Sequence, residues 1–393
     1  MTPQAGRPVP PAMSDLAALR EQATVNDSST SGRTAHAVGM VTEGGKLERL
    51  DIQRRPVGPR DVDIEIDYCG LCHSDVHSAR GEWGAKELPL VTGHEIVGRV
   101  VALGSEVQGF ELGERVGVGC LVDSCGQCES CEQGLEQYCL NGNVGTYASK
   151  NPKTGEYTQG GYSTSIVVDQ DFVLHVPESL DPAAAAPLLC AGITTYSPLN
   201  HLFVDQDDAV GVIGLGGLGH MAVKLAKAMG AIVTVFTTSP EKVDAAKELG
   251  AEYVVLSKDE DAMKAARGTL DVIIDTVAAP HDLNLYLRTL KVDGALVQVG
   301  LPSEAMPPIK PGALISRRLT YMGSNIGGIA ETQEVLDFCA EHGIVSDIEL
   351  ITADNVNEAW DRMVAGDVKY RFVMDINSLR EADAGAPTVE ATA

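Results

Sequence analysis

The chain has 393 residues, 44% of them hydrophobic and 22% charged, so it is long enough for roughly two or three globular domains and is neither wholly disordered nor a small disulfide-stapled scaffold. Its 30 Lys and Arg residues stand against 55 Asp and Glu residues, and the net charge of −25 repels nucleic acids and anionic membranes. No apolar run of about 18 residues predicts a transmembrane helix, and no signal peptide is recognisable. We therefore expect a cytoplasmic protein whose partner is a small molecule, with no nucleic acid and no membrane.

The first half of the chain has the pattern of a β-rich domain. Residues 1–33 are rich in Pro, Ser, Thr and Ala without apolar periodicity, and we expect them to form a flexible extension. Strands are predicted at 61–66, 96–102 and 115–118. The glycine-rich turns beside these strands suit a partly open barrel.

Strands and helices alternate from about residue 181 onward. Asp181 and Pro182 predict a helix start, with an N-cap followed by proline at the first helical position. Apolar runs predict strands at 209–213, 232–236, 253–256, 272–275 and 295–299. Between them lie helical patterns at 218–229 and 241–249, closed by Gly230 and Gly250. This order predicts an α/β doubly wound parallel sheet. A helix is expected at 331–342 and a loose polar tail at 378–393.

A glycine-rich turn follows the predicted strand at 209–213. Gly214, Gly216 and Gly219 fit the G-x-G-x-x-G pattern and, with Gly217 and Leu218, open a helix. The glycines allow a tight turn, close approach to a pyrophosphate, and close helix–strand packing. Because helix N-termini bind anions, this turn predicts a dinucleotide site rather than a merely glycine-rich loop.

The residues after the strand at 232–236 bear on the choice of cofactor. The strand ends in the hydroxyl residues Thr237, Thr238 and Ser239 instead of the acid that binds the ribose of NAD, and Lys242 follows. Hydroxyl donors and a cation suit a 2′-phosphate, which favours NADP(H). Glu241 argues against this choice unless it complements the dipole of the next helix, and Lys242 could equally be a solvated helix residue.

Five of the nine cysteines lie between residues 120 and 139. Cys125, Cys128, Cys131 and Cys139 supply the four thiolates of a closed, structural zinc site in a lobe at 120–140. A redox C-x-x-C pair is the alternative, and the fourth cysteine argues against it. The unassigned cysteines are expected to be buried apolar residues: Cys69, Cys120 and Cys339.

Three further residues offer the ligands of an open zinc site. Cys72, His94 and Cys190 form a Cys₂His set, which leaves one position for substrate. Spacing alone does not decide between this site and ordinary buried residues.

Several long motifs together resemble the zinc-dependent medium-chain alcohol dehydrogenases, in particular the cinnamyl alcohol dehydrogenase branch with its bacterial NADPH-dependent aldehyde reductases. The motifs are CGLCHSDVH, TGHEIVGRV, the four-cysteine lobe, LLCAGITTYSPL, VGVIGLGGLGHMAVKLAKAMGA and DVKYRFV. The resemblance covers about residues 34–377. It implies a GroES-like partial β-barrel catalytic domain at 34–190 and 328–377, interrupted by a Rossmann domain at 191–327.

The resemblance also implies roles for individual residues. Catalytic zinc would lie on Cys72, His94 and Cys190, with Glu95 as a possible alternate ligand and Asp75 orienting the histidine. Ser74 would exchange a proton with the substrate oxygen, and His77 would end that relay near solvent. The remaining matches lie beside the cofactor, at the pyrophosphate (His73) or the nicotinamide (Thr194, Ser324, Asn325 and Ile326).

The predicted function is zinc-assisted hydride transfer between NADP(H) and aldehydes or primary alcohols, with two zinc ions per chain. Family pocket positions fall at Trp83, Asn325 and either Gly145 or Thr146, which favours a roomy, rather polar pocket for aromatic and medium aliphatic aldehydes. The family implies a homodimer or homotetramer. The alternatives are an NAD-linked alcohol or polyol dehydrogenase and a non-catalytic zinc- and dinucleotide-binding protein. A zinc-free quinone reductase would need neither set of metal ligands.

Overall fold

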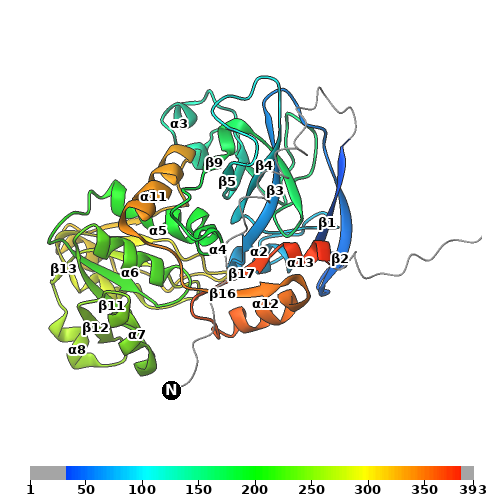
Figure 1. Ribbon diagram of the computed structural model, residues 1–393. Coiled ribbons are helices and arrows are strands. Elements are labelled where there is room, and N and C mark those ends of the chain that lie inside the picture. The colour runs from blue at the N-terminus through cyan, green and yellow to red at the C-terminus, as the bar shows by residue number, and fades with distance from the viewer. Residues whose placement is uncertain (1–31, 382–393) are drawn as a thin grey trace, which may run out of the picture.

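The computed structural model describes residues 32–381 and consists of two halves, each built on its own sheet (Figure 1). The first half holds a seven-stranded, mainly antiparallel sheet, in which β8 (Ser165–Asp169) pairs with β3 beside the main path. The order along the main path is β16 (Ile348–Thr352), β17 (Arg371–Asp375), β3 (Asp61–Gly70), β4 (Ile96–Leu103), β5 (Arg115–Val118) and β9 (Leu174–His175). Because β16 and β17 come from the end of the chain, the C-terminal segment completes the first half.

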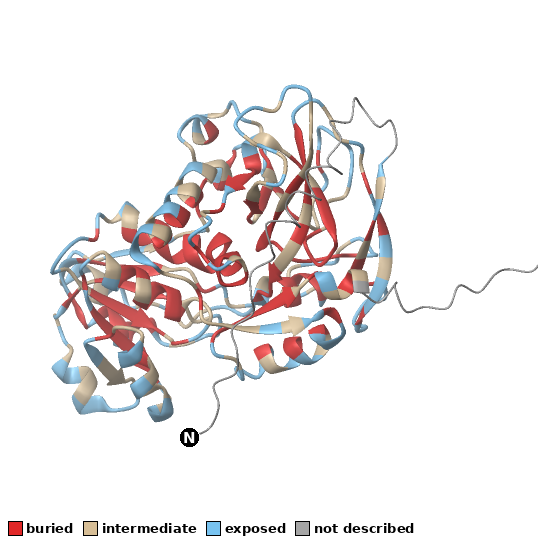
Figure 2. Ribbon diagram, in the orientation of Figure 1, coloured by how far each residue is buried: buried red, intermediate tan, exposed pale blue. Residues whose placement is uncertain are grey.

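Smaller elements surround this sheet. Two-stranded pairs are formed by β1 (Arg33–Met40) with β2 (Leu47–Arg54) and by β6 (Leu121–Asp123) with β7 (Val144–Gly145). The helices of this half are α2 (His73–Ala79), α3 (Glu129–Glu132), α4 (Pro182–Ala185), α12 (Val356–Val364) and α13 (Asn377–Glu381). Apolar strand residues and one face of α12 form its core, and Figure 2 shows the buried residues concentrated on the sheets.

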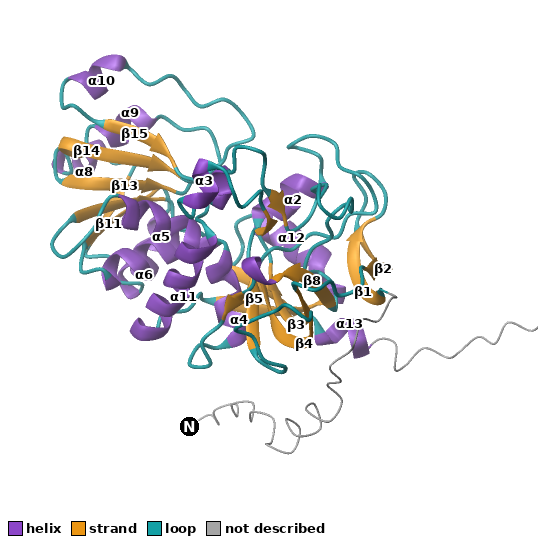
Figure 3. Ribbon diagram, turned by 90° about the horizontal axis from the view of Figure 1, so that it is seen from above, coloured by secondary structure: helices purple, strands orange, loops and turns teal. Residues whose placement is uncertain are grey.

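The second half is a six-stranded, wholly parallel sheet. Its order is β12 (Tyr253–Leu256), β11 (Ile232–Thr237), β10 (Ala209–Ile213), β13 (Leu270–Asp275), β14 (Leu290–Gln298) and β15 (Thr320–Gly323). Two apolar clusters cover its two faces, one with α5 (Ala191–His201), α6 (Gly219–Ala228) and α11 (Ile329–His342), the other with α8 (Glu260–Ala265), α9 (Leu283–Leu287) and α10 (Pro311–Ile315) (Figure 3). The remaining helix is α7 (Val243–Glu248). This is the predicted doubly wound sheet.

The predicted capping residues begin and end helices as expected. The Asp181 carboxylate accepts a hydrogen bond of 3.0 Å from the Ala184 amide and caps α4. Gly230 and Gly250, just beyond α6 and α7, adopt φ values of +93° and +116°, which only glycine adopts without strain. The helix expected at 241–249 starts late, because residues 240–242 form a 3₁₀ turn.

The predicted N-terminal extension and C-terminal tail are both wrong where they meet the folded part of the chain. Residues 378–381 belong to α13 instead of the tail, since Leu379 is buried and the Arg380 guanidinium donates to the carbonyl oxygens of Ile66 and Thr164 at 2.9 and 3.0 Å. Arg33, placed in the N-terminal extension, begins β1 and forms an ion pair with Asp63 at 2.6 Å. The rest of the predicted extension and tail lies outside the described residues.

The predicted domain boundaries at 190–191 and 327–328 stay predictions, because α5 and α11 pack together across them. The rings of Tyr196 and Phe338 from these two helices are 5.6 Å apart. Within residues 32–381, no helix is long and apolar enough to cross a membrane.

Candidate active site

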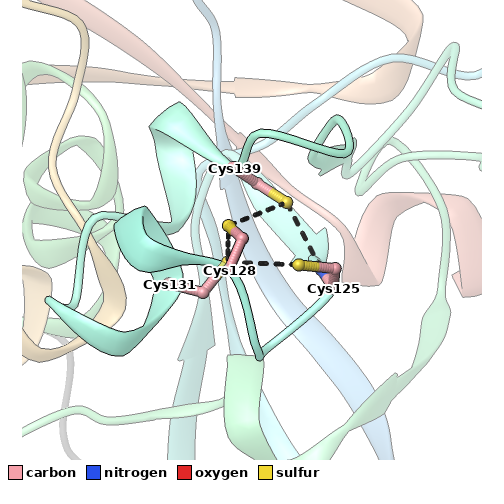
Figure 4. Close-up of side chains that lie close together, drawn as sticks. All are labelled: Cys125, Cys128, Cys131 and Cys139. Atoms are coloured by element: carbon pink, nitrogen blue, oxygen red, sulfur yellow. Dashed lines mark hydrogen bonds between the residues drawn. The ribbon is translucent and has the colours of Figure 1, made fainter.

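The four lobe cysteines converge as the sequence predicts. Cys125, Cys128, Cys131 and Cys139 point their sulfur atoms at one another around α3 (Figure 4), and all four lie within 4.8 Å of each other. The sulfur–sulfur distances include 3.5 Å for Cys128–Cys131 and 3.9 Å for Cys125–Cys131. Tetrahedral zinc with Zn–S bonds of about 2.3 Å places its sulfurs about 3.8 Å apart, so the donor set fits a structural zinc ion.

A second cluster lies in the first half of the molecule, which we call the catalytic half. It lies close to the boundary with the second half, which holds the parallel sheet. Cys72, His94, Glu95 and Cys190 are all buried, and one donor atom of each lies within 4.8 Å of the others. The sulfurs of Cys72 and Cys190 are 3.9 Å apart, and His94 Nε2 is 3.2 Å from the Cys190 sulfur. Cys72 and Cys190 directly precede α2 and α5, and His94 precedes β4. These distances again match a tetrahedral zinc site.

The buried Asp75 carboxylate holds the ligand residues in place. One oxygen lies 3.3 Å from His94 Nδ1 and accepts a hydrogen bond from the Gly93 amide. The other oxygen accepts from the Cys72 amide at 2.9 Å and from the Tyr162 hydroxyl at 2.8 Å. With Nδ1 facing a carboxylate, Nε2 of His94 is left free to bind metal.

Glu95 forms a buried ion pair with Arg371 of β17. Burial raises the pKa of Glu95 to about 7, and its second oxygen is buried without a hydrogen-bond partner. A side chain at Gly70 would collide with that oxygen, since a Cβ there would lie 1.9 Å from it. The orphaned oxygen beside the Cys₂His set is the feature that a metal ion or its bound water would satisfy.

The glycine-rich turn has the predicted backbone. Gly214 adopts φ +88° at the end of β10, and a Cβ at Gly219 would lie 2.2 Å from the Gly214 carbonyl oxygen. Gly216 has open space where a side chain would stand. Gly217 lies against Arg371, whose side chain a Cβ would meet at 2.9 Å. With Leu218 at the N-cap of α6, this turn fits a pyrophosphate, and Arg371 connects it to Glu95.

The residues predicted to read a 2′-phosphate lie at the end of β11, next to this turn. Lys242 Nζ donates to the Leu215 carbonyl oxygen at 3.0 Å, so it points back toward the turn instead of into solvent. The Thr237 hydroxyl is buried and accepts from the Ser239 amide, while Thr238 and Glu241 are exposed.

The predicted proton relay lies on α2. The Ser74 hydroxyl is 3.6 Å from the Cys72 sulfur. His77 stacks on Trp83 at 5.0 Å and its Nδ1 contacts the Glu82 carboxylate. His73 is exposed on the same helix, with its ring 6.3 Å from that of His77.

The predicted nicotinamide residues lie at the boundary between the halves. Thr194 is buried on α5, one turn after Cys190. The segment Ser324, Asn325 and Ile326 follows β15, and the Asn325 amide donates to the Tyr138 hydroxyl of the zinc lobe at 3.0 Å. The zinc lobe therefore supports the segment that connects the parallel sheet to the rest of the chain.

Comparisons with known proteins agree with this geometry. Residues 58–178 match the alcohol dehydrogenase GroES-like domain and residues 217–341 match the zinc-binding dehydrogenase family. The chain is 55% identical to aldehyde reductase YahK of Escherichia coli over 348 residues, covering 88% of this chain and 99% of the relative. It is 52% identical to NADP-dependent alcohol dehydrogenase C 1 of Mycolicibacterium smegmatis over 349 residues, with the same coverage. The chain belongs to the zinc-binding alcohol dehydrogenases.

Solved structures place this dehydrogenase near the predicted branch. It resembles a cinnamyl alcohol dehydrogenase of Sorghum bicolor with a TM-score of 0.85 and 44% identity, covering 91% of this chain and all of the other. It also resembles a CAD of Helicobacter pylori complexed with NADP(H), with a TM-score of 0.83 and 40% identity, covering 88% and 99% of the two chains. The predicted fold class and family are confirmed.

Sequence reasoning missed two residues of the dehydrogenase site, Arg371 and Tyr162. The motif DVKYRFV was matched without a role for Arg371, although an arginine at the start of an apolar run is itself a signal. Tyr162, which donates to Asp75, stands next to two glycines and carried no comparable signal.

One prediction about the site surroundings was wrong. Cys120 is half-buried beside the ligands instead of in an apolar core, and hydrogen bonding with the Cys190 thiol lowers its pKa to about 6. The aromatic ring beside His94 belongs to Tyr147, at 5.6 Å, while the Thr146 hydroxyl donates to the Gly119 carbonyl oxygen. Cys69 and Cys339 are fully buried, as expected.

Proposed function

We propose that the protein transfers hydride between NADP(H) and aldehydes or primary alcohols at the Cys72–His94–Cys190 cluster. The observation that carries this function is the juxtaposition of an open metal-ligand set with a dinucleotide turn, joined through the Glu95–Arg371 pair. When bound, zinc supplies a Lewis acid for the substrate oxygen and NADPH supplies the hydride.

The chain's own residues hold and orient these groups. Asp75 fixes the His94 ring and the start of α2, so the ligand atoms keep their geometry without substrate. Two thiolates and a neutral imidazole would offset the charge of a divalent cation, leaving the site able to accept a carbonyl and release an alcohol. Arg371 contributes positive charge beside Gly217, where a pyrophosphate would lie.

We propose that Ser74 passes the proton between the substrate oxygen and His77. Ser74 lies beside a ligand sulfur, and His77 is one helical turn further on, partly exposed between Trp83 and Glu82. A partly exposed imidazole can act as a general acid or base and exchange protons with water.

The preference for NADP(H) rests on Lys242, Thr237 and Ser239. No carboxylate ends β11, and the Lys242 ammonium is directed to the turn that would hold the phosphates. The relatives named for NADP dependence support the same choice. An NAD-linked enzyme is therefore the less favoured alternative.

Broad reduction of aromatic and medium aliphatic aldehydes is the substrate class that we propose. Tyr147 and Trp83 give the site aromatic walls, while Asn325 and Cys120 make it more polar than a wholly aromatic pocket. The relatives include both an aldehyde reductase and mannitol dehydrogenases, so a panel must include polyols.

We also propose a cytoplasmic homodimer or homotetramer. β15 is one of the two edge strands of the parallel sheet, and the exposed side chain of Tyr321 lies on it. An open edge with an exposed aromatic residue favours pairing with another copy. Sedimentation of the zinc-loaded protein as a monomer at micromolar concentration would contradict this.

The experiment compares initial rates of cinnamaldehyde reduction with NADPH and NADH, before and after zinc chelation. We expect rapid, chelator-sensitive turnover with NADPH and a much lower rate with NADH. Preference for NADH would refute the role given to Lys242. No turnover of any aldehyde by protein with two bound zinc ions, or activity on polyols alone, would refute the substrate class.

A further inference from the structure

A hollow of about 600 Å³ lies at the edge of the parallel sheet that faces away from the glycine-rich turn. Arg267, Arg288 and Arg317 stand two or three residues before β13, β14 and β15, and Lys310 precedes α10. Since parallel strands begin at one common edge, the three arginines gather there. In Figure 3, β13 and β14 point toward the catalytic half, so their beginnings lie on the opposite side.

The four cations have no acidic partners in the described part of the chain. None of them forms an ion pair there, and the other lining residues carry no charge: Asn284, Leu287, Gly312, Ala313 and Ser316. Their neighbours behave differently, since Lys291 pairs with Asp271 and Arg318 with Asp293. The Asp282 carboxylate accepts a hydrogen bond of 2.6 Å from the side-chain amide of Asn284, and this bond, helped by the nearby charges of Lys310 and Arg288, lowers the pKa of Asp282, which pairs with neither cation. On a chain with a net charge of −25, four neighbouring cations without an ion-pair partner form a distinct positive site.

Hydrogen bonds hold this site in shape. The half-buried Arg317 guanidinium donates to the carbonyl oxygens of Arg288, at 3.2 Å, and Leu290, which ties it to the connection between α9 and β14. The buried Asn284 accepts from the Lys310 amide at 2.8 Å and donates to the Pro308 carbonyl oxygen at 3.1 Å. The backbone that carries Lys310 and the guanidinium of Arg317 are therefore positioned before any ligand arrives.

We propose that this hollow binds a small anion carrying a diphosphate, either free or as part of a nucleotide. Guanidinium groups match phosphate oxygens in pairs, and a diphosphate brings two to three negative charges to four cations. The volume is ample for a diphosphate, and the partly exposed Ala313 offers apolar surface beside it for an attached base. This site is separate from the cofactor turn and does not depend on the proposed function.

The test is calorimetric titration of zinc-loaded enzyme, kept saturated with NADP⁺ so that the cofactor site is filled. Inorganic pyrophosphate and ADP are the two probes, at low ionic strength. We compare wild type with Arg267→Gln/Arg288→Gln and with Lys46→Gln/Lys150→Gln, a control pair of exposed lysines in the catalytic half that removes the same charge. Arg317 stays, because its guanidinium supports the backbone.

We expect saturable binding to wild type and to the lysine pair, and at least tenfold weaker binding to the arginine pair. Equal affinity for both probes would assign the site to the diphosphate alone, and tighter ADP binding would assign it to a nucleotide; either supports the proposal. Absence of binding to wild type, or equal weakening in both double variants, would overturn it.

Discussion

Asp75 and His94 are joined inside the catalytic half by a contact of 3.3 Å between carboxylate and imidazole Nδ1. Asp75 also accepts hydrogen bonds from the amides of Cys72 and Gly93 and from the Tyr162 hydroxyl. One buried carboxylate thus connects two segments that supply metal ligands. Its position explains how residues from distant parts of the chain are held together in one site.

Replacing this carboxylate is expected to weaken the catalytic zinc site alone. Asp75→Asn keeps the shape but loses the charge that faces His94, and such outer partners typically contribute about 10- to 100-fold to metal affinity. Titration with a competing chelator should show one weakened zinc ion and one unchanged ion. Tyr162→Phe, which removes one donor and keeps the carboxylate, should have a smaller effect. Unchanged affinity of both ions in Asp75→Asn would refute this role.

Arg371 is expected to support both stability and cofactor binding. Arg371→Gln leaves Glu95 buried without its partner, a change that typically costs about 3–5 kcal/mol. Denaturant unfolding should show this loss, and the KM for NADPH should rise because Gly217 loses its cationic neighbour. The double variant Arg371→Gln/Glu95→Gln should regain much of the stability but not the KM. If it regains both, Arg371 has no role in cofactor binding.

Lys242 is expected to distinguish the two cofactors. A hydrogen bond to a charged group contributes about 1.5–3 kcal/mol, so Lys242→Gln should raise the KM for NADPH at least tenfold and leave that for NADH nearly unchanged. Lys247→Gln, an exposed lysine on α7, is the matched control. Steady-state kinetics with both cofactors provides the measurement. An equal change for NADPH and NADH would mean that Lys242 contributes only to the loop.

His220 is expected to make folding sensitive to acid. It is fully buried on α6 between the Gly216 carbonyl oxygen and the Ser346 hydroxyl, and burial lowers its pKa to about 3. Below the unfolded value of about 6.5 only the unfolded chain binds this proton, so stability falls as pH drops, by up to about 1.4 kcal/mol per pH unit. Urea unfolding between pH 6.5 and 5 should show a shallower pH dependence in His220→Gln.

The exposed His201 offers a control on the neighbouring helix α5. His201→Gln should keep the steep pH dependence of the wild type. The same slope in all three proteins would show that His220 does not contribute.

Local patterns predicted the parts of the molecule that are local in the chain. The alternation of strands and helices, the glycine turn at Gly214 and the four-cysteine lobe each need only neighbouring residues, and all form as expected. The Cys72–His94–Cys190 set joins three distant segments, so its assignment depended on family resemblance. Arg371 meets Glu95 across 276 positions, and no periodicity encodes that contact. Residues 378–381 were predicted as tail, because a single buried leucine is too weak a signal for a helix.

The most direct test combines metal content with activity in Cys190→Ser. Wild type should contain two zinc ions per chain and reduce cinnamaldehyde with NADPH. The variant should retain the lobe zinc, lose the other ion and lose at least about a thousandfold in kcat/KM, a loss of about 4 kcal/mol in transition-state stabilisation. A Cys190→Ser variant that contains one zinc ion and turns over at the wild-type rate would contradict the assignment of this cluster as the catalytic centre.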